Sequence, residues 1–256
     1  MKLDIQAICN KGLVRSNNED AISLGGFFLR DESASLKADT PQDGYFYLLV
    51  CDGMGGHENG EEASEYALAS IKEKLAAREV SPDSFEDDIR RVAYSISGEL
   101  NRIAASRGQE RPMGCTLTGV VWYYGKTWLL NAGDSRTYRC RNGILRQLTT
   151  DETDRGITGN PEASKLLHNC LGGGCQGHLA IEDISDKLLD GDILLICSDG
   201  LCDMVPDEAI EEALTGGFGA EDLLHMAYDG GGVDNISIIV ARIGNGSQLP
   251  DPKANS

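Results

Sequence analysis

The sequence has little positive charge for its length. Of its 256 residues, 23 are Lys or Arg and 41 are Asp or Glu, so the formal net charge is −18. A field of this sign repels phosphate backbones and anionic lipid surfaces, so we expect neither nucleic acid nor a membrane as a partner. The surplus of carboxylates has two compatible interpretations: it keeps the protein in solution, and a few of its members bind cations.

Long apolar runs are also lacking. The first ten residues do not follow the basic-then-apolar order of a secretory signal, and no run reaches the length of a membrane-spanning helix. We therefore expect a cytoplasmic protein. The eight Cys include no C-x-x-C pair, and neither Cys170/Cys175 nor Cys197/Cys202 has a zinc spacing. Buried reduced thiols are the favoured interpretation, with a redox pair at Cys170/Cys175 as the alternative.

Regular alternation of strand and helix patterns is absent, which argues against a Rossmann sheet. The hydrophobic periodicity predicts strands over 3–9, 21–29, 45–51, 115–124, 126–132, 137–141, 144–148, 192–198 and 235–243, and helices over about 60–78, 85–103, 207–214 and 220–228. Helices segregated from mostly antiparallel strands indicate an α+β fold.

The remaining segments are polar or rich in glycine. We expect an exposed loop over 31–43 and irregular structure over 149–177. No internal repeat or linker divides the chain, so we expect one domain over residues 1–243. The polar residues 244–256 are expected to form a disordered tail.

Four aspartates share one sequence context, in which each lies beside glycine at an end of an apolar predicted strand. They are Asp52, Asp134, Asp199 and Asp234. Asp is a poor strand residue and is costly to bury without a partner. Several such carboxylates would repel one another, and a hard divalent cation, which prefers oxygen ligands, relieves that repulsion. One Asp-Gly pair usually marks a turn, but four in this context favour a metal site.

Two further segments are ambiguous on their residues alone. For the polar segment 12–21, the favoured interpretation is a loop with an Asx turn at Asn17 or Asn18. The run Gly172-Gly173-Gly174 lacks the Lys and Ser/Thr of an ATP-binding loop, so a flexible connection is favoured there.

Six short segments together carry a family resemblance. They are Arg15-Ser-Asn-Asn-Glu-Asp20-Ala, Asp52-Gly-Met-Gly-Gly-His57-Glu-Asn-Gly60, Met113-Gly-Cys-Thr-Leu117, Gly133-Asp-Ser-Arg136, Ser198-Asp-Gly200 and Asp234-Asn-Ile-Ser237. With them the chain resembles the type 2C protein phosphatases, the metal-dependent PPM family, and in particular its bacterial branch. Any one segment is weak, whereas six in family order across about residues 3–243 are specific.

This resemblance implies a fold and a metal centre. The fold is a four-layer αββα sandwich, in which helices flank two central, mostly antiparallel β-sheets and two Mn²⁺ or Mg²⁺ ions lie between the sheets. Asp52 would bridge both ions and the Gly53 carbonyl would bind one of them. Asp199 and Asp234 would hold the other ion.

Three further roles follow from the same resemblance. Asp20 would orient metal-bound water or bind a metal directly, with Glu19 as its neighbour. Arg15 would neutralise the phosphoryl oxygens, which suits the planar fork of a guanidinium. Asp134 resembles a ligand of a third, weaker metal site, and its alternative role is a structural turn with Arg136.

The implied reaction is hydrolysis of phosphoserine and phosphothreonine in proteins by a water that two cations activate, without a phosphoenzyme. The partners would be phosphoprotein substrates, in opposition to a serine/threonine kinase, and we expect a monomer. Two alternatives stay open: a non-catalytic binding or regulatory protein of the same fold, and a metal hydrolase that acts on a small phosphoester.

The sequence departs from the family pattern at two places. Met54 stands where some members have His as a candidate general acid, and His57 is interpreted as a helix-entry or packing residue. The segment after Thr149 is shorter than the flap of bacterial members, and Asn160-Pro161-Glu162 lies where they have a basic segment. We therefore expect substrate selection to differ.

Overall fold

The computed structural model describes residues 1–55, 58–160, 162–164 and 166–244. One large sheet has the order β11-β10-β14-β15-β1-β4, with bounds Ile144–Gln147, Arg136–Arg141, Ile193–Cys197, Ile236–Gly244, Lys2–Asn10 and Glu32–Asp39. The other has the order β13-β9-β8-β5-β2-β3, with bounds Ala180–Asp183, Lys126–Ala132, Leu117–Tyr123, Tyr45–Cys51, Ala21–Leu24 and Phe27–Leu29. A small third sheet joins β12 (Leu171–Gly172), β7 (Gly114–Cys115) and β6 (Gly53–Met54).

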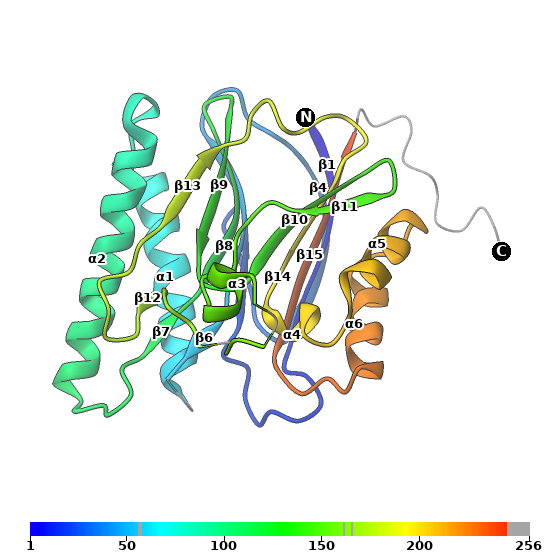
Figure 1. Ribbon diagram of the computed structural model, residues 1–256. Helices are drawn as coiled ribbons and strands as arrows, with labels where there is room; N and C mark the ends of the chain where they lie inside the picture. The colour runs from blue at the N-terminus through cyan, green and yellow to red at the C-terminus, as the bar shows by residue number, and fades with distance from the viewer. Residues whose placement is uncertain (56–57, 161, 165, 245–256) are drawn as a thin grey trace.

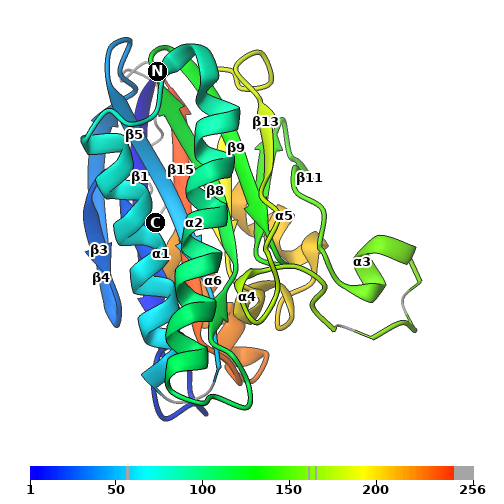
Figure 2. The same ribbon diagram turned by 90° about the vertical axis from the view of Figure 1, so that its left-hand side faces the viewer.

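Helices cover the outer faces of both large sheets (Figures 1 and 2). Their bounds are α1 Glu58–Ala76, α2 Phe85–Ser106, α3 Asp154–Thr158, α4 Asp199–Cys202, α5 Asp207–Thr215 and α6 Ala220–Asp229. The long helices α1 and α2 pack on the β5-β8-β9 side, and α4, α5 and α6 pack on the β10-β14-β15 side. The paired strands of the described residues run antiparallel, and the predicted αββα sandwich is confirmed.

The alternation of side chains along the central strands explains the layers. In β5, Tyr47 and Leu49 pack against the long helices, whereas Leu48 and Val50 face the other sheet. Successive strand residues point to opposite faces, so a strand that is apolar at every position is buried on both. The continuous apolar run 45–51 therefore indicates a strand that is buried on both faces, and β14 follows the same pattern.

Two sequence expectations are wrong. The segment 31–43 is not a loop, because most of it forms β4. This strand lies at the end of its sheet and pairs along its whole length with β1. Its half-buried Ala34, Leu36 and Ala38 alternate with exposed polar residues, but two of the three apolar residues are small alanines, so the strand signal is weak. The single strand expected over 21–29 is two strands, β2 and β3, because Gly25 and Gly26 have φ of 53° and 110° and turn the chain back.

The segment 149–177 is less irregular than expected, since it contains α3 and β12. Strand β13 was not predicted at all. Figure 2 shows α3 projecting from the body of the molecule. His57, Pro161 and the expected tail from residue 245 onward lie outside the described residues. Among the residues that are described, no helix combines the length and apolar character needed to cross a membrane.

Candidate metal centre

Strand register places Asp20 beside Asp52. Ala21 in β2 lies opposite Cys51 in β5. Asp20 immediately precedes Ala21 and Asp52 immediately follows Cys51, so the two aspartates lie at the same end of this strand pair. Asp52 is fixed further by Thr116, whose hydroxyl accepts from the Asp52 amide at 2.9 Å and whose own amide donates to the Asp52 carbonyl at 2.8 Å.

The other large sheet delivers its aspartates to the same edge. Asp199 is the first residue of α4, and one residue separates it from β14. Asp234 is likewise separated from β15 by one residue. These two strands pair with Cys197 opposite Ile238. Asp134 lies in the crossover from β9 to β10, which passes from one sheet to the other. The predicted ligands therefore meet where the two sheets face each other.

The raised pKa values of these carboxylates show that they are buried close to one another. Burial raises the pKa of Asp52 well above its usual value, and the charges of Asp20 and Asp199 raise it further. Burial likewise raises the pKa of Asp20 to about 6 and that of Asp199 to about 7. The neighbouring charge of Asp134 adds to the shift of Asp199. Several buried carboxylates with raised pKa values indicate a site where a positive charge would relieve their repulsion.

Asp134 lies in a bend before β10, and its charge contributes to the raised pKa values of Asp52 and Asp199. Burial raises its pKa to about 6, with contributions from Asp151 and Asp203. The guanidinium of Arg136 is held instead by a bidentate pair with Asp151, at 2.9 and 2.6 Å. Arg136 thus anchors the start of the segment after β11 through Asp151.

The donor set fits hard divalent cations. Oδ1 of Asp20 and Oδ1 of Asp199 are buried without a hydrogen-bond partner, which is costly unless a cation or water satisfies them. Among the described residues, no three His, Cys, Asp or Glu side chains already lie in an arrangement that could hold a metal ion. The carboxylates are therefore close enough to interact, and they would have to draw together around a cation.

Arg15 lies at the rim of the cluster. Its Nη2 donates to Oδ2 of Asp234 at 2.6 Å, and its side chain is 53% exposed. Oδ1 of Asp234 accepts from the Asn235 amide at 2.8 Å. A guanidinium in this position can meet an anion that arrives from solvent, and it competes with a cation for the Asp234 carboxylate.

Two residues that the sequence reasoning did not single out position the ligands. Ser198 donates from its hydroxyl to Oδ2 of Asp20 at 2.7 Å and accepts from the Ser237 amide at 3.0 Å. Asn235 accepts from the Glu19 amide at 2.8 Å and donates to the carbonyls of Lys11 and Asn17, each at 2.9 Å. Both residues lie next to proposed ligands, and that adjacency was the available signal.

Asp203 was also missed. Its charge raises the pKa of both Asp134 and Asp199, although burial and other charges have larger effects. It follows Asp199 by four residues across α4, a spacing that places two helical side chains on one face. That spacing is visible in the sequence, but the short helix that gives it meaning is not.

Glycine at position 53 is required by packing. A Cβ there would lie 2.1 Å from the Gly60 carbonyl oxygen and 2.5 Å from that of Glu19. Three segments therefore meet at Gly53: β6, the start of α1 and the loop before β2. The Asx turn considered for that loop is formed by Asn18, whose Oδ1 accepts from the Asp20 amide at 3.2 Å.

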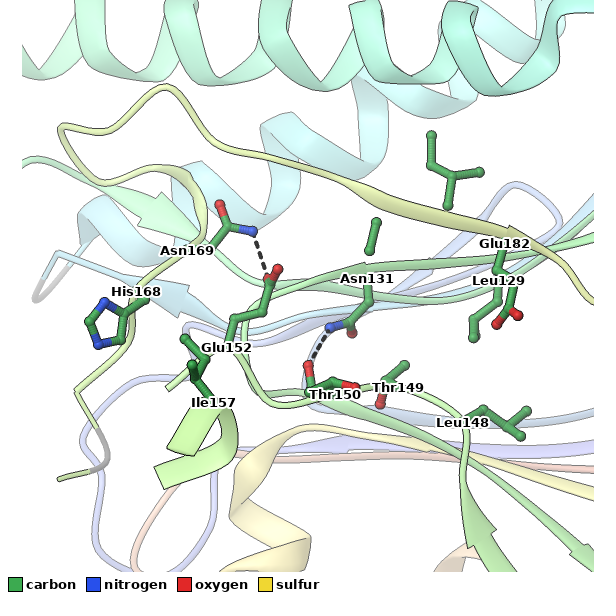
Figure 3. A pocket seen from close by; sticks show the side chains of 12 residues that line it. Leu129, Asn131, Leu148, Thr149, Thr150, Glu152, Ile157, His168, Asn169 and Glu182 are labelled. Carbon is green, nitrogen blue, oxygen red and sulfur yellow. Dashed lines mark hydrogen bonds between the residues drawn. The ribbon is translucent and has the colours of Figure 1, made fainter. Parts of the chain in front are cut away.

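A cavity of about 460 Å³ lies between the segment after β11 and the strands β9 and β13 (Figure 3). Glu152 forms one wall and ties the segment down, because its Oε2 accepts from the Gly133 amide at 2.7 Å and from Asn169 Nδ2 at 2.6 Å. Asn131, which also lines the cavity, donates to the carbonyl of Thr150 at 3.3 Å. The shortened flap is thus fastened at its base to the strand that precedes Asp134.

The family model for protein phosphatase 2C matches residues 26–222 of the chain. The chain belongs to the protein phosphatase 2C family. The serine/threonine protein phosphatase PstP of Mycobacterium tuberculosis is 32% identical in an alignment of 252 positions that covers 91% of this chain and 44% of PstP. The chain thus spans less than half the length of PstP.

One other relative, and the catalytic domain of PstP itself, match along almost their whole length. The serine/threonine phosphatase stp of Listeria monocytogenes is 29% identical over 248 residues, covering 90% of this chain and 92% of its own. The crystal structure of the PstP catalytic domain in complex with two manganese ions has a TM-score of 0.72 at 28% identity, covering 95% of this chain and all of that one. The resemblance to bacterial members of the 2C family is therefore confirmed.

Proposed function

We propose that this protein phosphatase 2C member is an active enzyme that hydrolyses phosphoserine and phosphothreonine in proteins, with two Mn²⁺ or Mg²⁺ ions. The observation that carries the proposal is the meeting of aspartates from both sheets, with two buried carboxylate oxygens that lack partners. The manganese-bound catalytic domain of PstP, which matches 95% of this chain, supports the same conclusion. A non-catalytic member would have no need to retain so costly an acidic cluster.

The ligands are assigned as the sequence suggested. Asp52 would be shared by both ions, the Gly53 carbonyl would hold one of them, and Asp199 and Asp234 would hold the other. Asp134 would hold a third, weaker ion, and the charge of Asp203 acts on Asp134. When bound, such ions lower the pKa of water near neutral pH and offset charge on the phosphoryl group.

The chain's own residues orient the reactants. Asp20, held through Oδ2 by the Ser198 hydroxyl at 2.7 Å, presents its other oxygen to the water that attacks phosphorus in line with the leaving Ser or Thr oxygen. Arg15 leaves the Asp234 carboxylate to bind two phosphoryl oxygens through its planar fork. Water or a side chain other than Met54 protonates the leaving group, because a thioether carries no proton.

The remaining proposals concern the molecule in its cell. We propose one phosphatase domain over residues 1–243 and action as a cytoplasmic monomer on phosphoproteins, against a serine/threonine kinase. The net charge of −18 disfavours phosphate-rich polymers as targets, so nucleic acid is not proposed as a partner.

The test compares the wild type with Asp199→Asn. We expect a phosphothreonine peptide to be hydrolysed with Mn²⁺ or Mg²⁺ and not with chelator, and we expect Asp199→Asn to lower kcat/KM by at least about 100-fold, because a neutral amide is a poor ligand for a hard cation. The matched control is Asp186→Asn, an exposed aspartate outside the cluster.

Two outcomes would change the assignment. A wild type without metal-dependent hydrolysis would make the chain a binding or regulatory member of the family. Turnover of a small phosphoester alone, with phosphopeptides left intact, would move the substrate class to small molecules. Circular dichroism of Asp199→Asn confirms that any loss of activity does not come from unfolding.

A further inference from the structure

Two cysteines face each other across a glycine turn at one end of the third sheet. Cys170 and Cys175 flank the Leu-Gly-Gly-Gly turn that contains β12, and their Sγ atoms lie 3.9 Å apart. We propose that these thiols are a redox modification site, which hydrogen peroxide converts to a disulfide that lowers phosphatase activity. The effect on activity rests on the proposed function, whereas disulfide formation does not.

The turn presets the two thiols for a bond. Gly172, Gly173 and Gly174 have φ of 81°, 62° and 79°, a left-handed run that other residues rarely adopt and that folds the chain back on itself. Asn101 of α2 fastens the turn, because its Nδ2 donates to the Cys175 carbonyl at 2.7 Å and its Oδ1 accepts from the Gly174 amide at 2.8 Å. A disulfide needs the sulfur atoms at about 2.05 Å, so closure requires only a small movement.

The two thiols differ in a way that suits a reactive cysteine and its resolving partner. Cys175 is partly exposed, whereas Cys170 is buried. Burial, with the neighbouring Cys175, raises the pKa of Cys170 far above its usual value, so Cys170 is a poor first nucleophile. Metal binding does not explain the pair, because no three Cys, His, Asp or Glu side chains in the described part of the chain could hold an ion.

The chemistry balances with peroxide as the oxidant. The Cys175 thiolate attacks one peroxide oxygen, the O–O bond breaks, and a sulfenic acid and water form. The Cys170 sulfur then displaces the sulfenic hydroxyl group, which leaves as a second water. Two thiols are oxidised by two electrons, one peroxide is reduced, and the thiol protons end in the two waters.

The third sheet connects this turn to the metal centre. In β12, Leu171 pairs with Cys115 of β7, and Cys115 also pairs with Gly53 of β6 (Figure 1). The Gly173 amide donates to the Met113 carbonyl at 2.8 Å, which fixes the turn to the same strand. Closing the disulfide replaces the contact of the Cys175 thiol with the Gly172 carbonyl at 3.1 Å. A shift of β12 would therefore move β7 and, through it, β6. Gly53 in β6 is closely packed, so its carbonyl would be displaced.

A second thiol pair provides the matched control. Cys202 is partly exposed like Cys175, and its neighbour Cys197 is buried like Cys170. Cys197 lies in β14, which is paired on both sides, and Cys202 ends α4. A bond between them would have to distort two regular elements next to Asp199, so we expect that pair to stay reduced.

The experiment treats the metal-loaded protein with hydrogen peroxide and reads mass and activity separately. Trypsin releases one peptide over residues 166–187, which holds Cys170 and Cys175, and another over 188–242, which holds Cys197 and Cys202. We expect the first peptide to lose two hydrogens, and hydrolysis of a phosphothreonine peptide to fall by about fivefold or more. Dithiothreitol should reverse both changes.

Variants decide between the two pairs. Cys175→Ser should keep its activity under peroxide, whereas Cys202→Ser should remain sensitive, each compared with its own untreated sample. The proposal is overturned if the 166–187 peptide keeps its mass, or if Cys202→Ser is the variant that protects. A disulfide in that peptide with unchanged activity overturns the regulatory effect. An untreated protein without activity refutes the proposed function, and the mass readout still tests the redox site.

Discussion

Arg15 is held by a carboxylate that a metal ion also needs. Its ion pair with Asp234, at 2.6 Å, joins residues 219 positions apart in the sequence at a half-exposed rim. The pair supplies no binding energy to an incoming phosphate, because the guanidinium must first release Asp234. We interpret it as a resting arrangement that places Arg15 within reach of substrate and lets a cation take its place.

From this position we expect Arg15→Ala to raise KM and to lower kcat/KM by about 10- to 100-fold, since a charge-assisted hydrogen bond contributes about 1.5–3 kcal/mol. Arg15→Lys should fall between, because it keeps the charge and loses the bidentate fork. Steady-state kinetics on a phosphothreonine peptide give these values, and Mn²⁺ titration calorimetry should find metal affinity retained or increased. Kinetics indistinguishable from wild type in both variants would remove Arg15 from the phosphate site.

At the scale of elements, β6 is short but fixes the relation between three segments. We expect Gly53→Ala to destabilise the protein by about 1–3 kcal/mol and to weaken Mn²⁺ binding, because its Cβ would lie 2.1 Å from the Gly60 carbonyl oxygen. The matched control is Gly98→Ala in α2, where no atom lies within 4 Å of the added Cβ. That change should stabilise the helix by about 0.5–1 kcal/mol.

Urea unfolding curves measure both variants, and calorimetry measures their metal affinity. Equal stability and equal Mn²⁺ affinity in Gly53→Ala and Gly98→Ala would mean that the contacts of β6 do not constrain the site.

Much of the element order was visible in the sequence because apolar strands and helical stripes have distinct periods. The strand ends before Asp52, Asp134 and Asp199 were predicted within one or two residues. Strand β4 was not, because an edge strand with one solvated face can carry polar residues at most positions. Short helices such as α4 are set by tertiary contacts, which a periodic pattern does not contain.

The candidate site was predictable as a set of residues and not as a geometry. Four repeated Asp contexts pointed to the cluster, and the family segments added Asp20 and Arg15. The Ser198 bond to Asp20 and the facing of Cys170 and Cys175 depend on how distant segments pack. Separation along the chain does not predict which of these side chains will be in contact.

For the whole molecule, the acidic cluster makes stability depend on pH. Burial raises the pKa of Asp20 to about 6, above the value near 3.9 of an unfolded chain. A group whose folded-state pKa is raised favours the folded state while it is protonated, so its contribution is complete below about pH 4 and is lost as the pH rises through 6. We expect the metal-free protein to lose on the order of 3 kcal/mol between these limits from Asp20 alone.

Thermal unfolding from pH 5 to pH 8 tests this, in chelator and in Mn²⁺. The gain in Tm from Mn²⁺ should grow with pH, because cations bind the ionised carboxylates and stabilise the folded state by mass action. Asp199→Asn, which removes one of the repelling charges, should show a smaller loss in chelator. A gain from Mn²⁺ that is equal at pH 5 and pH 8 would contradict the assignment of these carboxylates as ligands.

The position of Asp234 has a consequence for the protein as it is synthesised. This aspartate precedes β15, which lies in the middle of its sheet between β14 and β1. A nascent chain that has not yet delivered residues 236–244 lacks both a central strand and the segment that orients Asp234. Chains released early by a stalled ribosome would therefore carry the other carboxylates without a complete centre, and hydrolysis would begin only when the last strand has been inserted beside the first.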